Sequence, residues 1–453
     1  MRLFDIDLIN KYNRSGPRYT SYPTANNFSE LSLEDYKRQS VLSNQRRTAI
    51  SLYCHIPFCD TVCYYCGCNK VVTKDKSRAE PYIEALFKEI DMHSPFIDKD
   101  RLVEQMHFGG GTPTFLSGEQ IIRISNKLQQ TFNFSAEGEY SIEIDPRGID
   151  ESLIESLTIA KFNRISIGVQ DFDLEVQKAI NRVQSFEQTK KVIEMSRKSG
   201  FGSISIDLIY GLPRQSKETF KRTLERVKEL RPDRISLFNY AHLPELFKPQ
   251  RRINVKELPS PSEKLNIFQY SLEYLIELGY VYIGMDHFAL PEDPLAIAQS
   301  KGNLYRNFQG YSTHSECDIV GLGLSSIGQA ADSFSQNEKG LDKYYQAIES
   351  EQLPIVKGLI INQDDKIRKT LIMELICHFE VSISSLEEHY SIEFTKYFAD
   401  SLERLAEMQN DGLIELKSDS IKVMDRGKLL VRNICMVFDN YLKENSANFS
   451  KTI

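Results

Sequence analysis

A short stretch of this chain, CHIPFCDTVCYYCGC, holds five of its eight cysteines, between Cys54 and Cys68. Three of them, Cys59, Cys63 and Cys66, are separated by three and then by two residues. Zinc sites built on thiolates usually close with four ligands from two separate cysteine pairs, and this sequence has no second, distant pair. Three thiolates in one compact loop instead favour a four-iron cluster with one iron left open for a cofactor. Zinc and a redox-active thiol pair remain the alternatives on spacing alone.

The remaining cysteines are of two kinds. Cys68 follows Cys66 too closely to serve readily as a fourth ligand, so we expect its thiol beside the cluster, where it could stabilise or donate to a nearby group. The others fall outside this spacing and are expected to be small buried apolar residues: Cys54, Cys317, Cys377 and Cys435.

Polar and glycine-rich segments recur where predicted strands end. The segment 109–113, GGGTP, lacks large side chains and so lets backbone groups approach a ligand. Ligands of parallel α/β folds bind at the carboxyl ends of the strands, and each candidate there could by itself be a helix cap or a buried polar residue. These candidates are Glu143, Asp145, Gln170, Asp171, Arg182, Asp207, Asn239 and His242. Their common position predicts one shared site.

The elements that must position these residues alternate regularly. Short runs rich in β-branched residues are followed by helical stretches about six times between residues 50 and 240. This alternation predicts a parallel sheet with right-handed crossovers, and six units make an incomplete (β/α)6 TIM-like barrel. A helix over 262–280 and a strand over 281–289 are expected to extend its edge. We therefore expect an α/β catalytic barrel with an edge extension over residues 49–360.

The chain on either side of the barrel has a different pattern. Residues 1–48, which include SGPRYTSYPTA, lack periodicity and predict an arm that lies over the barrel. Residues 361–453 predict a smaller, mainly helical, winged-helix-like domain, with helices over 367–379 and 394–412, a hairpin over 414–424 and a last helix over 426–444. Winged helices commonly bind DNA, but this segment has no concentrated basic face. We favour a packing or lid domain.

Composition and charge narrow the class of protein. The 453 residues are 41% hydrophobic and 26% charged, which is typical of a globular chain of two or three domains. No segment approaches the ~20 apolar residues of a membrane helix. The first residues lack a secretory signal pattern, so we expect a cytoplasmic protein without membrane insertion, where crowded cysteines are better explained as metal ligands than as disulfides. The net charge of -7 argues against bulk nucleic-acid binding.

The cysteine loop, with aromatic Tyr65 before Cys66, resembles the CxxxCxΦC signature of radical S-adenosylmethionine enzymes. The longer stretch YCHIPFCDTVCYYCGCNK is similar to that of the oxygen-independent coproporphyrinogen III oxidase family. Further motifs similar to that family, over essentially the full length, are SGPRYTSYPTA, GGGTPTFL, SIEIDPR, SIGVQDF, IDLIYGLP, FNYAHLP, GLGLSSI and RNICM. The related haem chaperones share the three-cysteine loop but lack the fourth cysteine, so Cys68 and the arm point to the oxidases. Two departures are Tyr65, where phenylalanine is often seen, and Cys54, which replaces an aliphatic residue.

The resemblance implies an oxidoreductase of haem (porphyrin) biosynthesis, a coproporphyrinogen dehydrogenase. Such enzymes convert two propionate side chains of coproporphyrinogen III to vinyl groups without oxygen, through a 5′-deoxyadenosyl radical. The products are protoporphyrinogen IX, CO2, methionine and 5′-deoxyadenosine. The implied cofactors are a [4Fe-4S] cluster and S-adenosylmethionine, of which two molecules are expected. An electron donor and an electron acceptor are also required, and the sequence identifies neither.

The resemblance also implies site residues, carried over by matching positions. The cluster would be ligated by Cys59, Cys63 and Cys66. The first S-adenosylmethionine would be surrounded by Tyr53, Tyr65, Gly110, Glu143 and Ile327. The second would be held by Gly111, Thr112, Gln170, Arg182, Asp207 and Ala241. The implied catalytic residues resemble positions near the substrate or the radical in the family. They are Cys68, Phe308 and Gln309.

Two other functional classes remain open. One is a haem-binding or haem-trafficking protein that keeps the cluster without decarboxylation, and the other is a regulator that uses the C-terminal domain on nucleic acid. We expect the enzyme, as a monomer that binds coproporphyrinogen III and no nucleic acid. Because this substrate carries four carboxylates, a cationic patch is expected, for which Lys248, Arg251 and Arg252 are candidates. A solvated basic loop is the alternative for these three residues.

Overall fold

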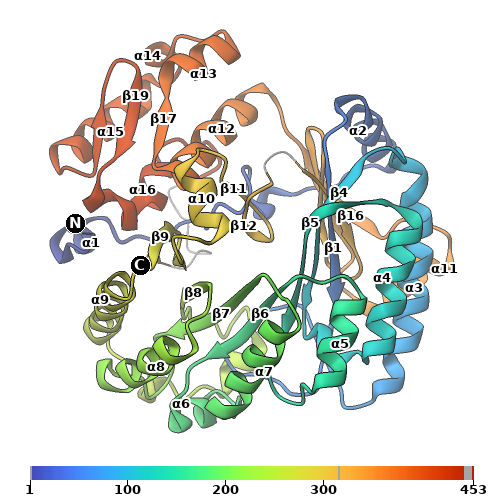
Figure 1. Ribbon diagram of the computed structural model, residues 1–453. Coiled ribbons are helices and arrows are strands. Elements are labelled where there is room, and N and C mark those ends of the chain that lie inside the picture. Colours follow the sequence, from blue (N-terminus) through green and yellow to red (C-terminus); the bar gives the residue numbers. More distant parts are fainter. Residues whose placement is uncertain (1–2, 315–316, 443–450, 453) are drawn as a thin grey trace. The chain divides into compact units, whose positions relative to one another are not determined.

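The structure of this protein is a computed structural model that describes residues 3–314, 317–442 and 451–452. The chain forms two compact units (Figure 1). The larger unit consists of Phe28–Leu278 and Glu316–Ile360, and the smaller unit of Met1–Asn27, Gly279–Ser315 and Ile361–Ile453. The strands of the predicted barrel belong to the larger unit.

The centre of the larger unit is a sheet whose parallel strands follow the chain. These strands are β1 (Ile50–Ile56), β4 (Leu102–Gly110), β5 (Asn133–Ile144), β6 (Arg164–Gln170), β7 (Ser203–Tyr210) and β8 (Arg234–Asn239). Beyond β1 the sheet continues through the parallel β13 (Asp318–Leu322) and the antiparallel β14 (Ile327–Ala330), β15 (Ser333–Asn337) and β16 (Ile355–Ile360). The prediction of an incomplete α/β barrel with parallel strands is confirmed.

Helices α3, α4, α5 and α7 cover the outer face of these strands (Figure 1). The helices of the larger unit are α2 (Leu33–Arg46), α3 (Ala79–His93), α4 (Gly118–Thr131), α5 (Glu151–Ile159), α6 (Leu174–Ala179), α7 (Phe186–Lys198), α8 (Lys217–Leu230), α9 (Pro261–Glu277) and α11 (Leu341–Glu349). Capping boxes at Ser117, Ser185 and Ser216 begin α4, α7 and α8. Helix α2 lies in the predicted arm, where no helix was expected.

The register of the parallel strands brings their carboxyl ends to one edge. Ile56 of β1 pairs with Gly110 of β4, and Gly168 of β6 pairs with Asp207 of β7. The segments that leave these strands therefore start side by side, as expected for the ligand-binding edge of a parallel α/β fold. The cysteine loop leaves β1 at this edge and is closed by the short parallel pair β2 (Phe58–Cys59) and β3 (Val71–Val72).

The smaller unit is mainly helical. Its helices are α1 (Ile6–Tyr12), α10 (Pro294–Ser300), α12 (Gln363–His378), α13 (Ile383–Tyr390), α14 (Phe394–Tyr397), α15 (Ala399–Asn410) and α16 (Val431–Cys435). Its strands form the hairpins β9 (Val281–Gly284) with β10 (His287–Ala289) and β11 (Tyr305–Asn307) with β12 (Gly310–Ser312), and a sheet of β17 (Glu380–Ser382), β19 (Ser420–Val423) and β18 (Ile414–Leu416). The hairpin predicted over 414–424 is confirmed.

Two predicted elements of this unit are wrong in detail. The single strand over 281–289 is interrupted by a turn at Met285 and Asp286, whose φ angles of +46° and +71° reverse the chain into the β9–β10 hairpin. The last helix is replaced by a 3-10 helix, Asp425–Leu430, followed by α16, which ends at Cys435. Residues 429–438 are all buried, so no single apolar face marked the end of the helix. Its predicted last residues, 443 and 444, lie outside the described residues.

Candidate active site

The three spaced cysteines line one cavity at the carboxyl edge of the sheet. Cys59 and Cys63 are buried and Cys66 is partly buried. The backbone N–H of Thr73 donates to the Cys59 carbonyl oxygen at 2.9 Å and closes the base of the loop. The cavity has a volume of about 240 Å³. Its other lining residues are Asp60, Thr61, Tyr65, Lys70, Gly111, Thr112, Thr114, Asp145, Arg147 and Arg182.

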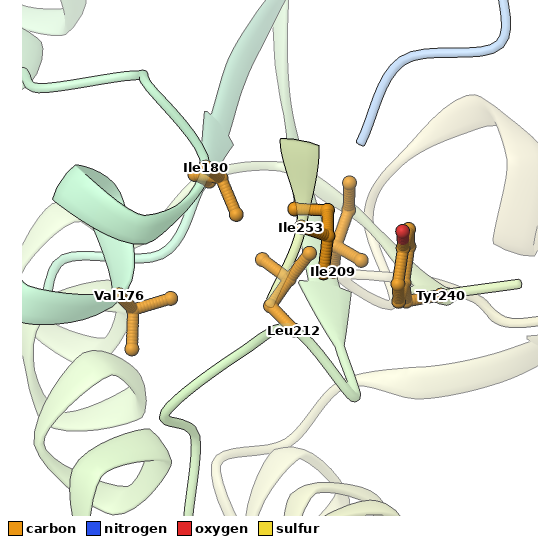
Figure 2. Packing of buried hydrophobic residues seen from close by; sticks show 6 residues of the cluster. All are labelled: Val176, Ile180, Ile209, Leu212, Tyr240 and Ile253. Atoms are coloured by element: carbon orange, nitrogen blue, oxygen red, sulfur yellow. The ribbon is translucent and has the colours of Figure 1, made fainter. Parts of the chain in front are cut away.

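A hydrophobic cluster packs against the cysteine loop. Figure 2 shows its buried members, Val176, Ile180, Ile209, Leu212, Tyr240 and Ile253. The rings of Tyr64 and Tyr65 pack against this cluster. The Tyr64 N–H also donates to the Ile180 carbonyl oxygen at 2.9 Å, and Asn181 Nδ2 donates to the Val62 carbonyl oxygen at 2.9 Å. The loop is therefore anchored by apolar packing and by backbone hydrogen bonds.

A buried glutamine joins the cysteine loop to the end of β8. Gln250 Nε2 donates to the carbonyl oxygens of Tyr65 at 3.0 Å and Ala241 at 3.2 Å. Ala241, a predicted ligand-binding residue, is thereby held beside the residue that precedes Cys66. No pattern in the sequence marked Gln250.

Two thiols meet polar groups of the cavity wall. Thr112 Oγ1 donates to Cys59 Sγ at 3.4 Å, and Arg182 Nη1 donates to Cys63 Sγ at 3.6 Å. Hydrogen bonds to cluster sulfurs are one means by which proteins set a reduction potential. Thr112 and Arg182 are therefore placed to influence a group bound by these thiols.

The state of the thiols differs along the loop. Burial raises the pKa of Cys59 to about 11. A hydrogen bond from the exposed Cys68 lowers the pKa of Cys66 to about 5, although burial acts against this shift. Cys68 therefore lies beside the predicted ligand Cys66.

The donor set fits a multi-iron group better than a single ion. Within the described residues, no three His, Cys, Asp or Glu side chains converge closely enough to hold one metal ion. The three thiols line one cavity of about 240 Å³. Three thiols around such a volume are the ligands that an iron–sulfur cluster takes.

The glycine turn after β4 fits against the cysteine loop at backbone distance. A Cβ atom on Gly111 would lie 2.6 Å from the Pro57 carbonyl oxygen, and one on Gly110 would lie 2.6 Å from the His55 ring. Gly110 also has a φ of +116°, which side chains rarely tolerate. The Gly111 N–H donates to the Ile56 carbonyl oxygen at 2.8 Å. Only glycine allows this approach, two residues from Cys59.

Gly111→Ala is expected to destabilise the cluster-free protein by about 1–3 kcal/mol and to lower the iron retained after reconstitution, because the new methyl group must displace the backbone that leads to Cys59. Urea unfolding and iron analysis measure the two effects. The matched control is Gly202→Ala, whose Cβ would meet nothing closer than 3.9 Å. Equal effects of the two substitutions would contradict the close-approach explanation.

Two predicted residues, Tyr53 and Gly110, lie around the predicted carboxylate of Glu143, together with His107. His107 Nε2 lies 3.4 Å from Glu143 Oε1, and the Gly110 N–H donates to Glu143 Oε2 at 3.3 Å. The Tyr53 ring stacks on the His107 ring, with centroids 5.9 Å apart. The backbone of Ile327 lies close to Tyr53's neighbour on the next strand. Gly321 of β13 pairs with Tyr53, and a Cβ atom on Gly321 would lie only 2.8 Å from the Ile327 carbonyl group.

Arg182 is the electrostatic centre of the opposite wall. Its guanidinium donates to Asp145 Oδ2 at 3.0 Å and to the Gly168 carbonyl oxygen at 2.6 Å, in addition to Cys63. Its buried Nε has no hydrogen-bond partner in the described part of the chain. Gln170 lies two residues after Gly168, at the end of β6. Its φ of +68° is a strained conformation that clusters at functional positions. A buried guanidinium with one unused donor is suited to an added carboxylate.

Asp207 stands next to this group, because it pairs with Gly168 across β6 and β7. Burial, with the charge of Glu143, raises the pKa of Asp207 to about 7, against an ordinary value of about 3.9. The folded protein thus keeps a proton between about pH 4 and pH 7 that the unfolded chain releases, so stability falls as the pH rises through this window.

Asp207→Asn is expected to remove that dependence. Between pH 4 and pH 8 the parent protein should lose about 2–4 kcal/mol of free energy of unfolding through Asp207, and the variant should not show this loss. Urea unfolding of the cluster-free chain at both pH values measures the difference, and the exposed Asp100→Asn is the control. A variant that differs from its parent equally at both pH values would refute the explanation.

Two predicted residues lie elsewhere in the chain. Phe308 and Gln309 form the turn between β11 and β12 of the smaller unit, whereas Cys68 belongs to the larger unit. The candidates Lys248, Arg251 and Arg252 form an exposed 3-10 helix of the larger unit, Lys248–Arg252, so their side chains are available to solvent.

Sequence reasoning missed two charged residues of the cavity. Arg147 binds both Asp145 carboxylate oxygens, with Nη2 at 2.6 Å from Oδ2, and Lys70 Nζ donates to the Cys66 carbonyl oxygen at 3.2 Å. Both residues belong to motifs noted in the sequence, Arg147 to SIEIDPR and Lys70 to CGCNK. The signal that could have found them is a cationic side chain within a few residues of a predicted site residue.

Comparisons with known proteins cover the whole chain. The Radical SAM superfamily matches residues 53–227, and the HemN C-terminal domain matches residues 361–430. An oxygen-independent coproporphyrinogen III oxidase from Pseudomonas aeruginosa is 50% identical over 455 residues, which cover 99% of each chain. This chain belongs to the oxygen-independent coproporphyrinogen III oxidase family. The Escherichia coli member is 47% identical over 452 residues, covering 99% of this chain and 98% of its own.

A solved structure supports membership of the oxygen-independent coproporphyrinogen III oxidase family. The structure of coproporphyrinogen III oxidase (HemN) from Escherichia coli, described as a radical SAM enzyme, matches with a TM-score of 0.93 at 45% identity, and the match covers 97% of this chain and 99% of that chain. The family and the fold predicted from the motifs are confirmed. Membership implies a [4Fe-4S] cluster and S-adenosylmethionine. In the described residues, no helix is long and apolar enough to cross a membrane.

Proposed function

We propose that this protein is a coproporphyrinogen dehydrogenase that converts two propionate side chains of coproporphyrinogen III to vinyl groups without oxygen, in haem biosynthesis. The observation that carries the proposal is the three-thiol cavity at the barrel edge, in a chain 50% identical over its length to an enzyme of that name. The products are protoporphyrinogen IX, CO2, methionine and 5′-deoxyadenosine.

Cys59, Cys63 and Cys66 would hold the cluster, since all three line the same cavity. When bound, the cluster and S-adenosylmethionine supply a carbon radical that removes a hydrogen atom from an unactivated propionate carbon. The chain contributes position and shielding from water around this chemistry. Cys68, Phe308 and Gln309 are the residues proposed to act near the substrate.

The first S-adenosylmethionine would lie at the Glu143 side of the site. The Glu143 carboxylate is suited to accept hydrogen bonds from an ammonium group, and the Tyr65 ring beside Cys66 is suited to stack on a base. The proposed residues are Tyr53, Tyr65, Gly110, Glu143 and Ile327.

A second molecule would lie at the Arg182 side. The unused Nε donor of Arg182 suits its carboxylate, and Asp207 suits its ammonium group or ribose. The proposed residues are Gly111, Thr112, Gln170, Arg182, Asp207 and Ala241. The two sets of residues surround different polar centres, Glu143 and Arg182, which supports two molecules rather than one.

Further parts of the proposal concern the setting of the reaction. An electron donor must reduce the cluster, and a separate acceptor must take the electron left after CO2 is lost. We propose a cytoplasmic monomer that binds no nucleic acid. We also propose that residues 1–48, 49–360 and 361–453 act as an arm, a catalytic barrel and a covering domain.

An anaerobic assay tests the function. The protein is reconstituted with iron and sulfide and supplied with dithionite, S-adenosylmethionine, coproporphyrinogen III and a cell extract as the source of acceptor. We expect 5′-deoxyadenosine and, after oxidation, protoporphyrin. Haem binding by a cluster-loaded protein that makes neither product would favour the haem-trafficking alternative, and a salt-sensitive DNA mobility shift would favour the regulator.

A further inference from the structure

A strained turn in the smaller unit presents a carboxylate. Three consecutive residues, Gly284, Met285 and Asp286, have φ angles of +125°, +46° and +71°. Met285 and Asp286 are the two central residues of the β9–β10 hairpin, where positive φ angles favour Gly, Asn or Asp, so Met285 is the unusual residue. A bulky side chain such as that of Met285 is uncommon in this backbone conformation.

A buried arginine of the same unit lacks partners. Arg306 on β11 is 5% exposed, and its Nε and Nη1 have no hydrogen-bond partner among the described residues. Its guanidinium lies over the Tyr311 ring, 4.7 Å from the centroid. A guanidinium is not deprotonated in proteins, and a buried charge without a hydrogen-bonded counterion costs several kcal/mol. The ring contact satisfies neither N–H group.

The groups around Arg306 leave a positive excess. Arg18 and Asp286 interact electrostatically with Arg306, and Arg18 Nη2 lies 4.0 Å from Asp286 Oδ2. Burial raises the pKa of Asp286, although three arginines act against this shift. One carboxylate therefore faces three guanidinium groups. Burial and Arg306 lower the pKa of His287 to about 3, so this ring adds no charge at neutral pH.

The third arginine fixes the arm rather than a ligand. Arg432 Nε donates to the Pro17 carbonyl oxygen at 3.0 Å, and Nη1 donates to the Thr452 carbonyl oxygen at 3.2 Å. Its hydrogen bond to Pro17 sets the position of the next residue, Arg18. Arg306 is therefore the guanidinium with unsatisfied donors, and Arg18 adds a further positive charge near the single carboxylate of Asp286.

We propose that Arg306 binds a carboxylate of the substrate through charge-assisted hydrogen bonds from its unused Nε and Nη1 donors, while Arg18 adds positive charge nearby. The proposal rests on the proposed function, because coproporphyrinogen III carries four propionates. A guanidinium fork matches a carboxylate with two parallel bonds, which an ammonium group cannot reproduce. Arg306 also stands two residues before Phe308, at the hairpin turn that family resemblance places near the substrate.

Binding of a stable porphyrin tests the proposal without turnover. Coproporphyrin III, the oxidised tetra-acid, and its tetramethyl ester are titrated onto the full-length, cluster-free protein in one non-ionic detergent, with fluorescence as the readout. We expect the parent protein to prefer the acid, and Arg306→Gln to reduce that preference about 10- to 100-fold, as for loss of hydrogen bonds to a charged group. Arg306→Lys should recover only part of it.

The ratio of the two affinities separates binding from folding. If Arg306 only packs on Tyr311, its variants weaken acid and ester together and leave the preference unchanged, which overturns the proposal. Absence of any preference in the parent protein overturns it too. Arg18→Gln is the second variant, since its side chain is 36% exposed and its loss should reduce the preference about 3- to 10-fold without unfolding the chain. The exposed Arg404→Gln on α15 is the matched control and should change neither affinity.

The anaerobic assay and this titration can fail separately. Protoporphyrin formation with an Arg306-independent acid preference would leave the proposed function standing and refute the carboxylate site. An Arg306-dependent preference in a chain that forms no product would refute the proposed function and keep an anion site in the smaller unit.

Discussion

Cys63→Ala is expected to abolish formation of both 5′-deoxyadenosine and protoporphyrin. Cys63 is buried in the three-thiol cavity and accepts a hydrogen bond from Arg182, and no other cysteine of the described chain lines that cavity besides Cys59 and Cys66. Two thiols cannot replace three as cluster ligands. Without the cluster, the activity should fall by at least about 10⁶-fold, the lower range of enzymatic rate enhancement.

Iron and sulfide content, the visible absorbance of the cluster and product analysis measure this effect together. Cys54→Ala is the matched control, because Cys54 is a fully buried residue of β1 that does not line the cavity. It should lose some stability and keep both the cluster and the products. A Cys63→Ala protein that retains a full cluster and turns over substrate would show that the assigned ligands are wrong.

Arg182→Met is expected to have two effects. The first is a loss of about 3–5 kcal/mol in free energy of unfolding, because the substitution breaks a buried ion pair with Asp145 and leaves the Gly168 carbonyl oxygen with a weaker partner. The second is a fall from two to one in the number of S-adenosylmethionine molecules bound per cluster-loaded chain, since Arg182 is the proposed carboxylate partner of the second molecule.

Urea unfolding measures the first effect, and equilibrium dialysis with labelled S-adenosylmethionine measures the second. Arg222→Met is the control, because Arg222 forms an exposed pair with Asp173 at 3.0 Å, which is worth at most about 1 kcal/mol. If Arg182→Met still binds two molecules, Arg182 has only a structural role. If the parent protein binds one, the second site does not exist.

The sequence was sufficient to predict the barrel and the edge at which the site lies. Strands such as ISLYCHI and SISIDLI are rich in β-branched and other apolar residues, and three of the helices between the strands begin with serine caps, so local pattern and fold agree. Because parallel strands share a carboxyl edge, Glu143, Gln170, Arg182 and Asp207 could be grouped before any coordinate was known. Spacing alone separated Cys59, Cys63 and Cys66 from the other cysteines.

Other features depend on contacts between distant segments, which one sequence does not reveal. Gln250 contacts Tyr65, 185 residues before it in the chain, and also Ala241, and nothing in the sequence around Gln250 predicts this contact. Arg306 reads as an ordinary polar residue of a short strand, and only burial without partners distinguishes it. The Met285–Asp286 turn was missed because Met285 does not favour positive φ and no glycine follows Asp286.

Deuterium transfer from the substrate tests the central claim most directly. Coproporphyrinogen III with deuterium on the β-carbons of its propionates is incubated anaerobically with the reconstituted protein, and 5′-deoxyadenosine is analysed by mass spectrometry. If this chain directs hydrogen abstraction from the propionates, one deuterium appears in 5′-deoxyadenosine, and protoporphyrin forms alongside it. Unlabelled 5′-deoxyadenosine in a reaction that produces protoporphyrin would contradict the account.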